Sequence, residues 1–406
     1  MKSILINTIL VRSGQMTHIW DLVTQLKARG YEINVAIYVN DKSHNKHNIT
    51  YSDIHTLTAP FGDTPILLYG QKEELIHYSN LKNIQLIHAH SSLTFPHAYA
   101  VSRQLSIPLV LTLHGVMPWM KWYPRTIEQA SQIIAVGPAQ AQEIMHKFSK
   151  KTHIISNGID TAKYHPDPEL GNRWHEEDNF KKPHSLNVIW FGRTHGSSSR
   201  GVEALDAAIK LLRNQGFHIE ARLVGVSSGS SVSEFETFGW IEDPIEHLRW
   251  GHVAYGHGRA LREAMACGNV GILLGHGYGG IVQQSWYANK AHTVLSAIPQ
   301  YDLPYPDPET IAYDLASLYN DDKLIWELRK KARKIAEHYF DLYAMVNRTV
   351  EVYHEAIEAR TEKVSFRLSA EDKNYLLYKA AEYKMTTSDF LVKLIKDDKQ
   401  SSNNQA

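Results

Sequence analysis

Short apolar runs alternate with amphipathic stretches from residue 4 to residue 158. The runs have the length of strands, and residues 16–28 repeat their apolar positions with the period of a helix. Strands that alternate with helices indicate a doubly wound α/β sheet whose strands are mostly parallel. We therefore expect a Rossmann-like domain over residues 1–170, with strands at 4–10, 33–38, 86–90, 109–115, 133–137 and 153–158.

A polar stretch at residues 165–185 interrupts the alternation and predicts a linker between two domains. The alternation then resumes, which predicts a second Rossmann-like domain over residues 185–340. In open α/β sheets ligands bind beyond the carboxyl ends of the strands, so we expect the two domains to face one another across a cleft that holds the site. The expected strands of the second domain are 186–192, 220–225, 252–256 and 270–275, with a helix at 200–214.

The pattern changes again toward the carboxyl terminus. Residues 341–360 carry one apolar stripe, typical of a single helix that closes the two-domain fold. Residues 363–398 have the pattern of one alternating strand and two helices, which predicts a small separate module. The polar tail at 399–406 is expected to be disordered.

Composition narrows the class of protein. Lys plus Arg equals Asp plus Glu at 43 each, so no overall charge draws the chain to nucleic acid or to a charged membrane. The one cysteine, Cys267, excludes an internal disulfide framework, and no secretory signal is recognised. The apolar runs are far shorter than a bilayer span. We expect a cytoplasmic protein with at most peripheral membrane contact.

The stretch VIWFGRTHGSSSRG (188–201) ends a predicted strand and opens a predicted helix. Gly192 allows close approach of the backbone to a ligand, while the helix N-terminus together with Arg193 and Arg200 favours an anion with several oxygens. A diphosphate fits these requirements. The alternative is an ordinary strand-to-helix turn with solvated arginines.

The stretch YGHGRALREAMACG (255–268) is a second glycine-rich helix start. Gly256 and Gly258 free the backbone, and Glu263 early in the helix is suited to accept hydrogen bonds from the two vicinal hydroxyls of a ribose. Alternatively, Glu263 is a surface charge and the glycines are turn residues. The two motifs together favour a nucleoside diphosphate site.

Three segments in this order resemble glycosyltransferase family 4, which has the GT-B fold: HIISNGIDTAKYHP (153–166), WFGRTHGSSSRG (190–201) and GHGRALREAMACG (256–268). The resemblance extends from residue 1 to about residue 358. It implies a retaining, metal-independent glycosyltransferase of the hexosyltransferase type, with no cofactor. The implied donor is a nucleoside diphosphate sugar, a UDP-sugar first of all.

The resemblance also implies roles for individual residues. His114 would lie near the reacting sugar, Arg193 and Arg200 would bind the donor diphosphate, and Glu263 would bind the ribose. Gly14 would face the donor phosphates and the acceptor. The predicted catalytic residues are His114, Arg193 and Arg200, and the predicted donor-binding residues are Gly14, Gly192, Arg193, Arg200, Gly256, Gly258 and Glu263.

Two observations qualify these roles. Tyr255 stands where the family usually has a second glutamate that contacts the donor sugar, so the donor sugar stays open. Alternatively, His114 has only a structural role, with its hydrogen bonds made locally at the end of a strand.

The sequence contains no clear metal site. No Asp-x-Asp ends a strand, and His88, His90 and His97 lack acidic partners nearby, so we interpret these three as cleft or surface residues and expect no metal site.

In the carboxy-terminal module, KVSFRL (363–368) alternates polar and apolar residues before two helices and resembles the ribbon-helix-helix family of dimeric DNA binders. That resemblance implies base contacts by Lys363, Ser365 and Arg367. The net charge of the module is only about +1, which is poor for a binder driven by phosphate contacts. We therefore favour a dimerisation module, and expect a homodimer.

The acceptor stays open among a glycan, a lipid-linked glycan and a small glycoside. Two alternatives treat the carboxy-terminal module as a DNA binder. One is a glycosyltransferase that modifies DNA bases, and the other is a non-catalytic regulator that senses a sugar nucleotide and binds DNA.

Overall fold

The computed structural model describes residues 2–39, 49–167, 185–194, 196–225, 231–288, 303–359 and 368–403. The chain divides into two compact units, residues 1–360 and 361–406, and each is described by itself. Most of the predicted linker lies outside the described residues, as do Lys363, Ser365 and Arg367 and the end of the tail.

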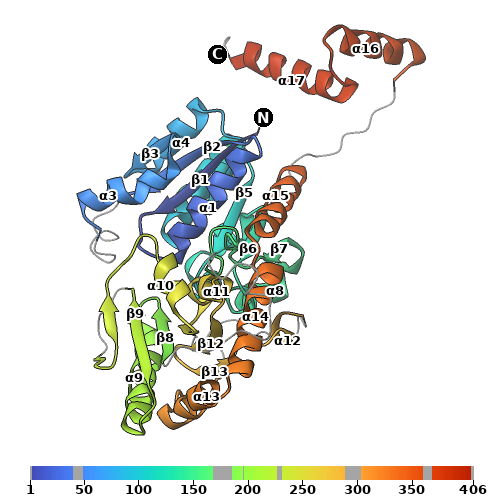
Figure 1. Ribbon diagram of the computed structural model, residues 1–406. Helices are drawn as coiled ribbons and strands as arrows, with labels where there is room; N and C mark the ends of the chain where they lie inside the picture. Colours follow the sequence, from blue (N-terminus) through green and yellow to red (C-terminus); the bar gives the residue numbers. More distant parts are fainter. Residues whose placement is uncertain are drawn as a thin grey trace. The chain divides into compact units, whose positions relative to one another are not determined.

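The amino-terminal half of the first unit is built on a seven-stranded sheet in the order β3-β2-β1-β4-β5-β6-β7 (Figure 1). Every pairing in it is parallel. Helices cover both faces, which explains why the inner strands read as continuous apolar runs. The strands are β1 (Ser3–Ile9), β2 (Glu32–Tyr38), β3 (Ile66–Tyr69), β4 (Leu86–Ala89), β5 (Leu109–Leu113), β6 (Gln132–Ala135) and β7 (Thr152–Ile154).

Seven α-helices connect these strands. The first begins after Ser13, whose hydroxyl accepts a hydrogen bond of 3.3 Å from the backbone N–H of Gln15 and so caps the helix. The helices are α1 (Gly14–Ala28), α3 (Tyr51–Thr58), α4 (Lys72–Leu81), α5 (Phe95–Leu105), α6 (Trp119–Trp122), α7 (Pro124–Gln129) and α8 (Pro138–Phe148) among the described residues.

The second half of this unit has a six-stranded sheet in the order β10-β9-β8-β11-β12-β13. Its pairings are parallel except that β13 runs antiparallel to β12. The strands are β8 (Leu186–Phe191), β9 (Ile219–Val224), β10 (Glu236–Phe238), β11 (Val253–Gly256), β12 (Val270–Leu274) and β13 (Tyr278–Ile281). The helices are α9 (Ser199–Asn214), α10 (Ile245–Trp250), α11 (Gly258–Ala266), α12 (Ser285–Ala288), α13 (Pro308–Asn320) and α14 (Asp322–Tyr339).

Helix α15 (Leu342–Glu358) returns from the second half to the amino-terminal half (Figure 1). Its buried side chains Met345, Val346 and Tyr353 belong to the same apolar core as Ile6 and Leu22. The two sheets are therefore joined by a helix that follows the second sheet in sequence but packs on the first.

The two mostly parallel sheets predicted from the sequence are confirmed. Three strands were not predicted: β3, β10 and β13. All three lie at a sheet edge. Strand β3 is an apolar run of only four residues, Ile-Leu-Leu-Tyr, whereas β10 has three residues with polar positions and β13 contains two glycines. Among the described residues no helix is long and apolar enough to cross a membrane.

The second unit contains helices α16 (Ala370–Glu382) and α17 (Thr387–Asn403) in its described part. Ser369 Oγ accepts a hydrogen bond of 3.0 Å from the N–H of Asp372, and Thr386 Oγ1 accepts one of 3.1 Å from Asp389. Lys384 adopts φ of +55° in the turn between the helices, a left-handed conformation in which glycine is the usual residue. This part is helical, and the strand of a ribbon-helix-helix fold falls largely on undescribed residues.

Candidate functional site

The first glycine-rich motif connects the end of β8 to the start of α9. Gly192 follows β8 with φ of +132°, a conformation that favours glycine. Gly201 lies in the first turn of α9, where a Cβ atom would stand 2.5 Å from a backbone carbonyl oxygen after β12. Arg193 and Arg200 are both exposed. The motif thus presents two guanidinium groups to solvent beside a helix N-terminus.

The second glycine-rich motif leads from β11 into α11. Gly256 and Gly258 have φ of +152° and +65°, respectively. Between them, His257 places Nε2 2.8 Å from the Oγ of Ser198, which lies directly before α9. Burial and then the charge of Arg193 lower the pKa of His257 to about 4. The two predicted motifs therefore meet in the fold, and Arg193 lies close to their junction.

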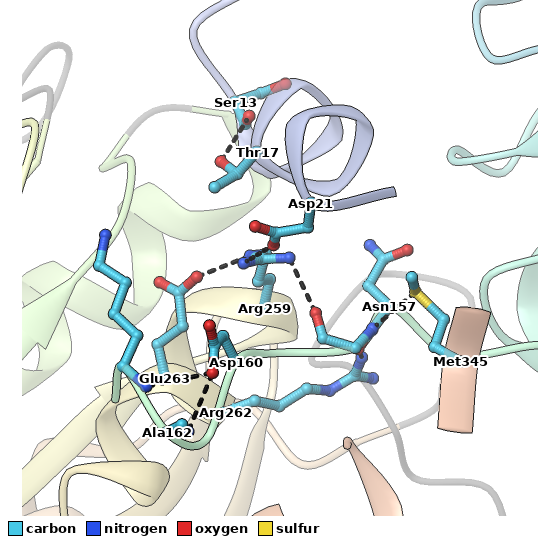
Figure 2. Close-up of polar contacts among 12 residues, drawn as sticks. Ser13, Thr17, Asp21, Asn157, Asp160, Ala162, Arg259, Arg262, Glu263 and Met345 are labelled. Atoms are coloured by element: carbon cyan, nitrogen blue, oxygen red, sulfur yellow. Dashed lines mark hydrogen bonds and ion pairs between the residues drawn. The ribbon is translucent and has the colours of Figure 1, made fainter. Parts of the chain in front are cut away.

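Figure 2 shows a cluster of ionisable side chains around Arg259 in the first turn of α11. Its Nε donates to Oε1 of Glu263 at 2.6 Å, and its Nη2 donates to Oδ2 of Asp21 on α1, also at 2.6 Å. Its Nη1 donates to the carbonyl of Gly158 at 2.8 Å. One guanidinium thus connects α1, α11 and the segment after β7. We call Asp21, Arg259 and Glu263 the ionic cluster.

Burial decides the chemistry of the ionic cluster. Glu263 is 5% exposed and Arg259 7%, so the interpretation of Glu263 as a surface charge is wrong. Burial raises the pKa of the Glu263 carboxyl, and the neighbouring Arg259 charge opposes that shift. The pKa of Asp21 is raised for the same reason and is opposed in the same way. The carboxylates compensate for the burial of Arg259, whose pKa is raised above its ordinary value although burial alone would lower it.

A second arginine of α11 anchors the same segment of chain. Nη1 of Arg262 donates to the carbonyl of Asn157 at 3.0 Å (Figure 2). The guanidinium of Arg262 lies 4.2 Å from the centroid of the Phe340 ring. A Cβ on Gly158 would lie 2.8 Å from the Cα of Leu342 at the start of α15. The glycine of the SNG motif therefore allows this segment to pass between α11 and α15.

Gly14 and Tyr255 take different places relative to this site. Gly14 is the exposed first residue of α1, and a Cβ there would lie 3.6 Å from the Cβ of Arg259. The predicted amino-terminal glycine thus lies beside the ionic cluster. Tyr255 is completely buried in the core of the second half. The position that the resemblance matches to a donor-binding glutamate therefore lies in the core.

His114, at the carboxyl end of β5, belongs to a cluster of four histidines that includes His18, His88 and His90. His114 Nε2 lies 3.2 Å from Nδ1 of His90, and the ring of His18 on α1 lies 5.2 Å from the His114 ring. His88 and His90 rings are 4.0 Å apart. We call these four residues the histidine cluster.

Burial is the main cause of a lowered pKa throughout the histidine cluster. It lowers the pKa of His88 and of His114 to about 3, and it lowers the pKa of His18 and His90 as well. His88 and His90 are fully buried, so interpreting them as cleft or surface residues is wrong; His97 is half-buried and packs against Tyr38 instead. All four imidazoles are therefore neutral near pH 7.

The histidine cluster and the ionic cluster are neighbours along α1. His18 and Asp21 are three residues apart, on one face of this helix. The charge of Arg259 contributes to the lowered pKa of His18, after burial and His114. Sequence reasoning missed His18, Asp21 and Arg259. The available signal was the pair of polar residues on the otherwise apolar face of the helix at 16–28.

Residues 12–163 match the profile of Glycosyltransferase Family 4. The chain is also 26% identical over 203 residues to phosphatidyl-myo-inositol mannosyltransferase from Propionibacterium freudenreichii subsp. shermanii. That alignment covers 46% of this chain and 51% of the relative, so the chain spans about half the length of the curated relative that it matches.

The fold is shared with solved glycosyltransferase structures. A glycosyltransferase from Rickettsia africae superimposes with a TM-score of 0.61 at 14% identity, over 88% of this chain and 99% of that one. HepE from Anabaena, crystallised with UDP and glucose, gives a TM-score of 0.59 at 14% identity, over 86% and 99%. The profile match, the sequence relative and the shared GT-B fold all support the prediction of a glycosyltransferase.

Proposed function

We propose that this protein is a retaining, metal-independent glycosyltransferase that uses a nucleoside diphosphate sugar as donor. The observation that carries the proposal is the junction of the two glycine-rich helix starts, held by the contact of 2.8 Å between Ser198 and His257. Two helix N-termini and exposed Arg193 and Arg200 then favour the same anion.

The departing nucleoside diphosphate gains negative charge as the sugar leaves. Arg193, Arg200 and the N-terminal N–H groups of α9 and α11 would stabilise that charge without reorganising. Such preorganised donors replace a metal ion in this proposal. His114 would lie beside the reacting sugar, because the end of β5 lies close to α1 and, through His18, to Arg259.

Glu263 would bind the ribose of the donor. Its Oε1 is held by Arg259, which leaves Oε2 to accept from the vicinal hydroxyls. Arg259 also favours the ionised carboxylate, the form that accepts two hydrogen bonds. Arg259 is thus a positioning residue for Glu263.

A UDP-sugar is the proposed donor, since HepE was crystallised with UDP and with UDP-glucose. The proposed acceptor is a glycan, a lipid-linked glycan or a small glycoside. The mannosyltransferase relative, named for phosphatidyl-myo-inositol, supports a lipid-linked acceptor. The alternatives directed at DNA draw no support from the described residues.

A homodimer through the second unit is proposed on a separate observation. The two helices expose several large apolar side chains, which a pair of isolated helices cannot bury by themselves. They are Tyr375, Leu377, Tyr378, Val392, Leu394 and Ile395. Light scattering of the full chain should give a dimer, and the Leu394→Lys variant a monomer. A monomeric wild-type chain would contradict this proposal.

The donor site is tested by thermal shift and hydrolysis with UDP-, GDP- and ADP-sugars in buffer containing EDTA. We expect one nucleotide class to stabilise the protein and to be hydrolysed slowly. Arg193→Ala should lower turnover by about 100- to 1,000-fold, as expected for the loss of one preorganised charge-stabilising group. Lys210→Ala, an exposed residue of α9, is the matched control. Wild-type turnover in Arg193→Ala would refute the donor site.

A further inference from the structure

The histidine cluster holds more imidazoles than the proposed transfer reaction requires. The ligand nitrogens of His18, His90 and His114 all lie within 4.8 Å of one another. They come from α1, from the residue after β4 and from the residue after β5, so tertiary packing alone assembles them. A tetrahedral ion with bonds of about 2.0–2.1 Å to nitrogen separates its ligand atoms by about 3.4 Å.

Two of the three nitrogens already have that separation. Nδ1 of His90 faces Nε2 of His114 at 3.2 Å. Two imidazole nitrogens in this arrangement either share one proton or direct both lone pairs at one cation. The pair therefore provides two ligands of a nitrogen site with little movement.

The third imidazole has an unused donor atom. His18 is only 5% exposed, and its buried Nδ1 has no hydrogen-bond partner among the described residues. Burial of a polar nitrogen without a hydrogen-bond partner is unfavourable, and a ligand on this nitrogen would remove that penalty. The three ligand nitrogens already lie within 4.8 Å of one another, so an adjustment of little more than 1 Å would give the spacing of about 3.4 Å that a tetrahedral ion requires.

His88 is excluded as a ligand because both of its nitrogens are bonded. Nδ1 lies 2.7 Å from the hydroxyl of Tyr353 on α15, and Nε2 lies 2.7 Å from Oγ1 of Thr112. Its ring, 4.0 Å from that of His90, holds the His90 ring in place. The site thus has three ligands with a supporting residue behind one of them.

We propose that His18, His90 and His114 bind one divalent transition-metal ion of the zinc type. Three neutral imidazoles without a carboxylate suit zinc, copper or nickel rather than magnesium or calcium, which prefer oxygen ligands. Three ligands leave the fourth position of a tetrahedral ion to a water molecule.

This ion would inhibit transfer, a consequence that rests on the proposed function. His114 is proposed to lie beside the reacting sugar, so an ion bound to its imidazole occupies that place and removes the side chain from the sugar. The ion is therefore no cofactor, and its removal by EDTA leaves the reaction intact.

Binding is tested on the full chain, freed of metal by dialysis against EDTA. Zn²⁺ is titrated in competition with a chromophoric chelator, and Co²⁺ is titrated while its visible d–d absorption is recorded. We expect one ion per chain. His18→Asn and His90→Asn should each weaken Zn²⁺ binding by about 100-fold or more, since even a lost outer partner of a metal ligand costs about 10–100-fold.

His146→Gln, on the exposed side of α8, is the matched control and should bind like the wild type. Thermal melting without metal checks that each variant folds, and the Co²⁺ spectrum of the wild type reports nitrogen ligands independently of any variant. Absence of Zn²⁺ binding by the wild type, or equal binding by folded His18→Asn and wild type, would overturn the site.

Inhibition is measured separately, as donor hydrolysis with and without Zn²⁺. We expect Zn²⁺ to inhibit the wild type and His146→Gln equally. Binding without inhibition would refute the inhibitory role alone. A chain that hydrolyses no donor contradicts the proposed function, whereas the Zn²⁺ titration still decides the metal site.

Discussion

The protein buries two neighbouring polar clusters and compensates for their burial in different ways. The histidine cluster lies among the strand ends of the amino-terminal half and is uncharged near pH 7, because burial lowers the pKa of each imidazole. The ionic cluster joins the two halves and keeps the charge of Arg259, whose guanidinium lies 2.6 Å from a carboxyl oxygen on either side.

The difference follows from what each side chain is able to do. A histidine loses its charge within the ordinary range of pH, so neutralisation costs little. An arginine keeps its charge, so it is stable in the interior only with acidic partners. Burial therefore makes the stability of the histidine cluster sensitive to acid, and that of the ionic cluster sensitive to the loss of one charged partner.

Acidification should have the largest effect on this comparison. The folded-state pKa of His88, about 3, lies below the unfolded value near 6.5, so the native state binds fewer protons. Its contribution is complete above pH 6.5 and is lost as the pH falls toward 3. By pH 5 the protonation of His88 in the unfolded chain lowers the free energy of unfolding by about 2 kcal/mol. The other three histidines act in the same direction.

Urea unfolding at pH 7.5, 6.5 and 5 measures this loss. The raised pKa values of Glu263 and Asp21 have the opposite sign, because the native state then binds protons more tightly than the unfolded chain. Stability that stays constant or rises between pH 6.5 and 5 would contradict the dominance of the histidine cluster.

Arg259→Met should have the next largest effect. The substitution leaves the Glu263 carboxylate buried without its cation, so we expect a loss of about 3 kcal/mol in the free energy of unfolding. Urea unfolding at pH 7.5 measures it, with Lys323→Met on the exposed face of α14 as control. A double-mutant cycle with Asp21→Asn gives the interaction energy between Arg259 and Asp21, the ion pair that connects the two halves. An unchanged urea midpoint in Arg259→Met would show that the ionic cluster contributes nothing to the stability of the fold.

Glu263→Gln should separate ligand binding from stability. If Glu263 binds the ribose, loss of its charged hydrogen bonds lowers the affinity for the donor by about 10- to 100-fold. Calorimetric titration with the nucleoside diphosphate identified in the donor screen gives this value. Glu203→Gln, exposed on α9, should bind like the wild type. Equal affinity in Glu263→Gln would remove Glu263 from the donor site.

Ser198→Ala should have the smallest effect. It removes one hydrogen bond between uncharged groups at the junction of the helix starts, worth about 1 kcal/mol. We expect donor affinity to fall by about 5-fold, measured by the same titration. A loss of donor affinity of about 100-fold or more would mean that the Ser198 hydroxyl contacts the donor directly.

Much of the fold was predictable because buried parallel strands are continuous apolar runs. The inner strands β1, β4, β5, β8 and β12 were predicted to within about two residues, and both helix starts were found from glycine and arginine. The edge strand β10 was missed, since three residues with polar positions carry no such signal.

The site was predictable only in part. The motifs indicated Gly192, Arg193 and Glu263, because their residue types and spacing suit a nucleoside diphosphate. They did not indicate that Arg259 would bind Glu263, or that His18 would meet His114 across 96 positions of sequence. Contacts between distant segments leave no periodic pattern in either segment.

The sequence by itself determined the alternation of strands and helices and the two glycine-rich helix starts, since these depend on local backbone preference and on the period of apolar residues. Only the tertiary structure decided which arginines are exposed and which are buried. Arg193 and Arg259 each follow a glycine directly in one of the two glycine-rich motifs, yet one is exposed to solvent and the other lies against α1. Whether a charged side chain can bind a ligand depends on which segments pack over it, and these segments lie far away in the sequence.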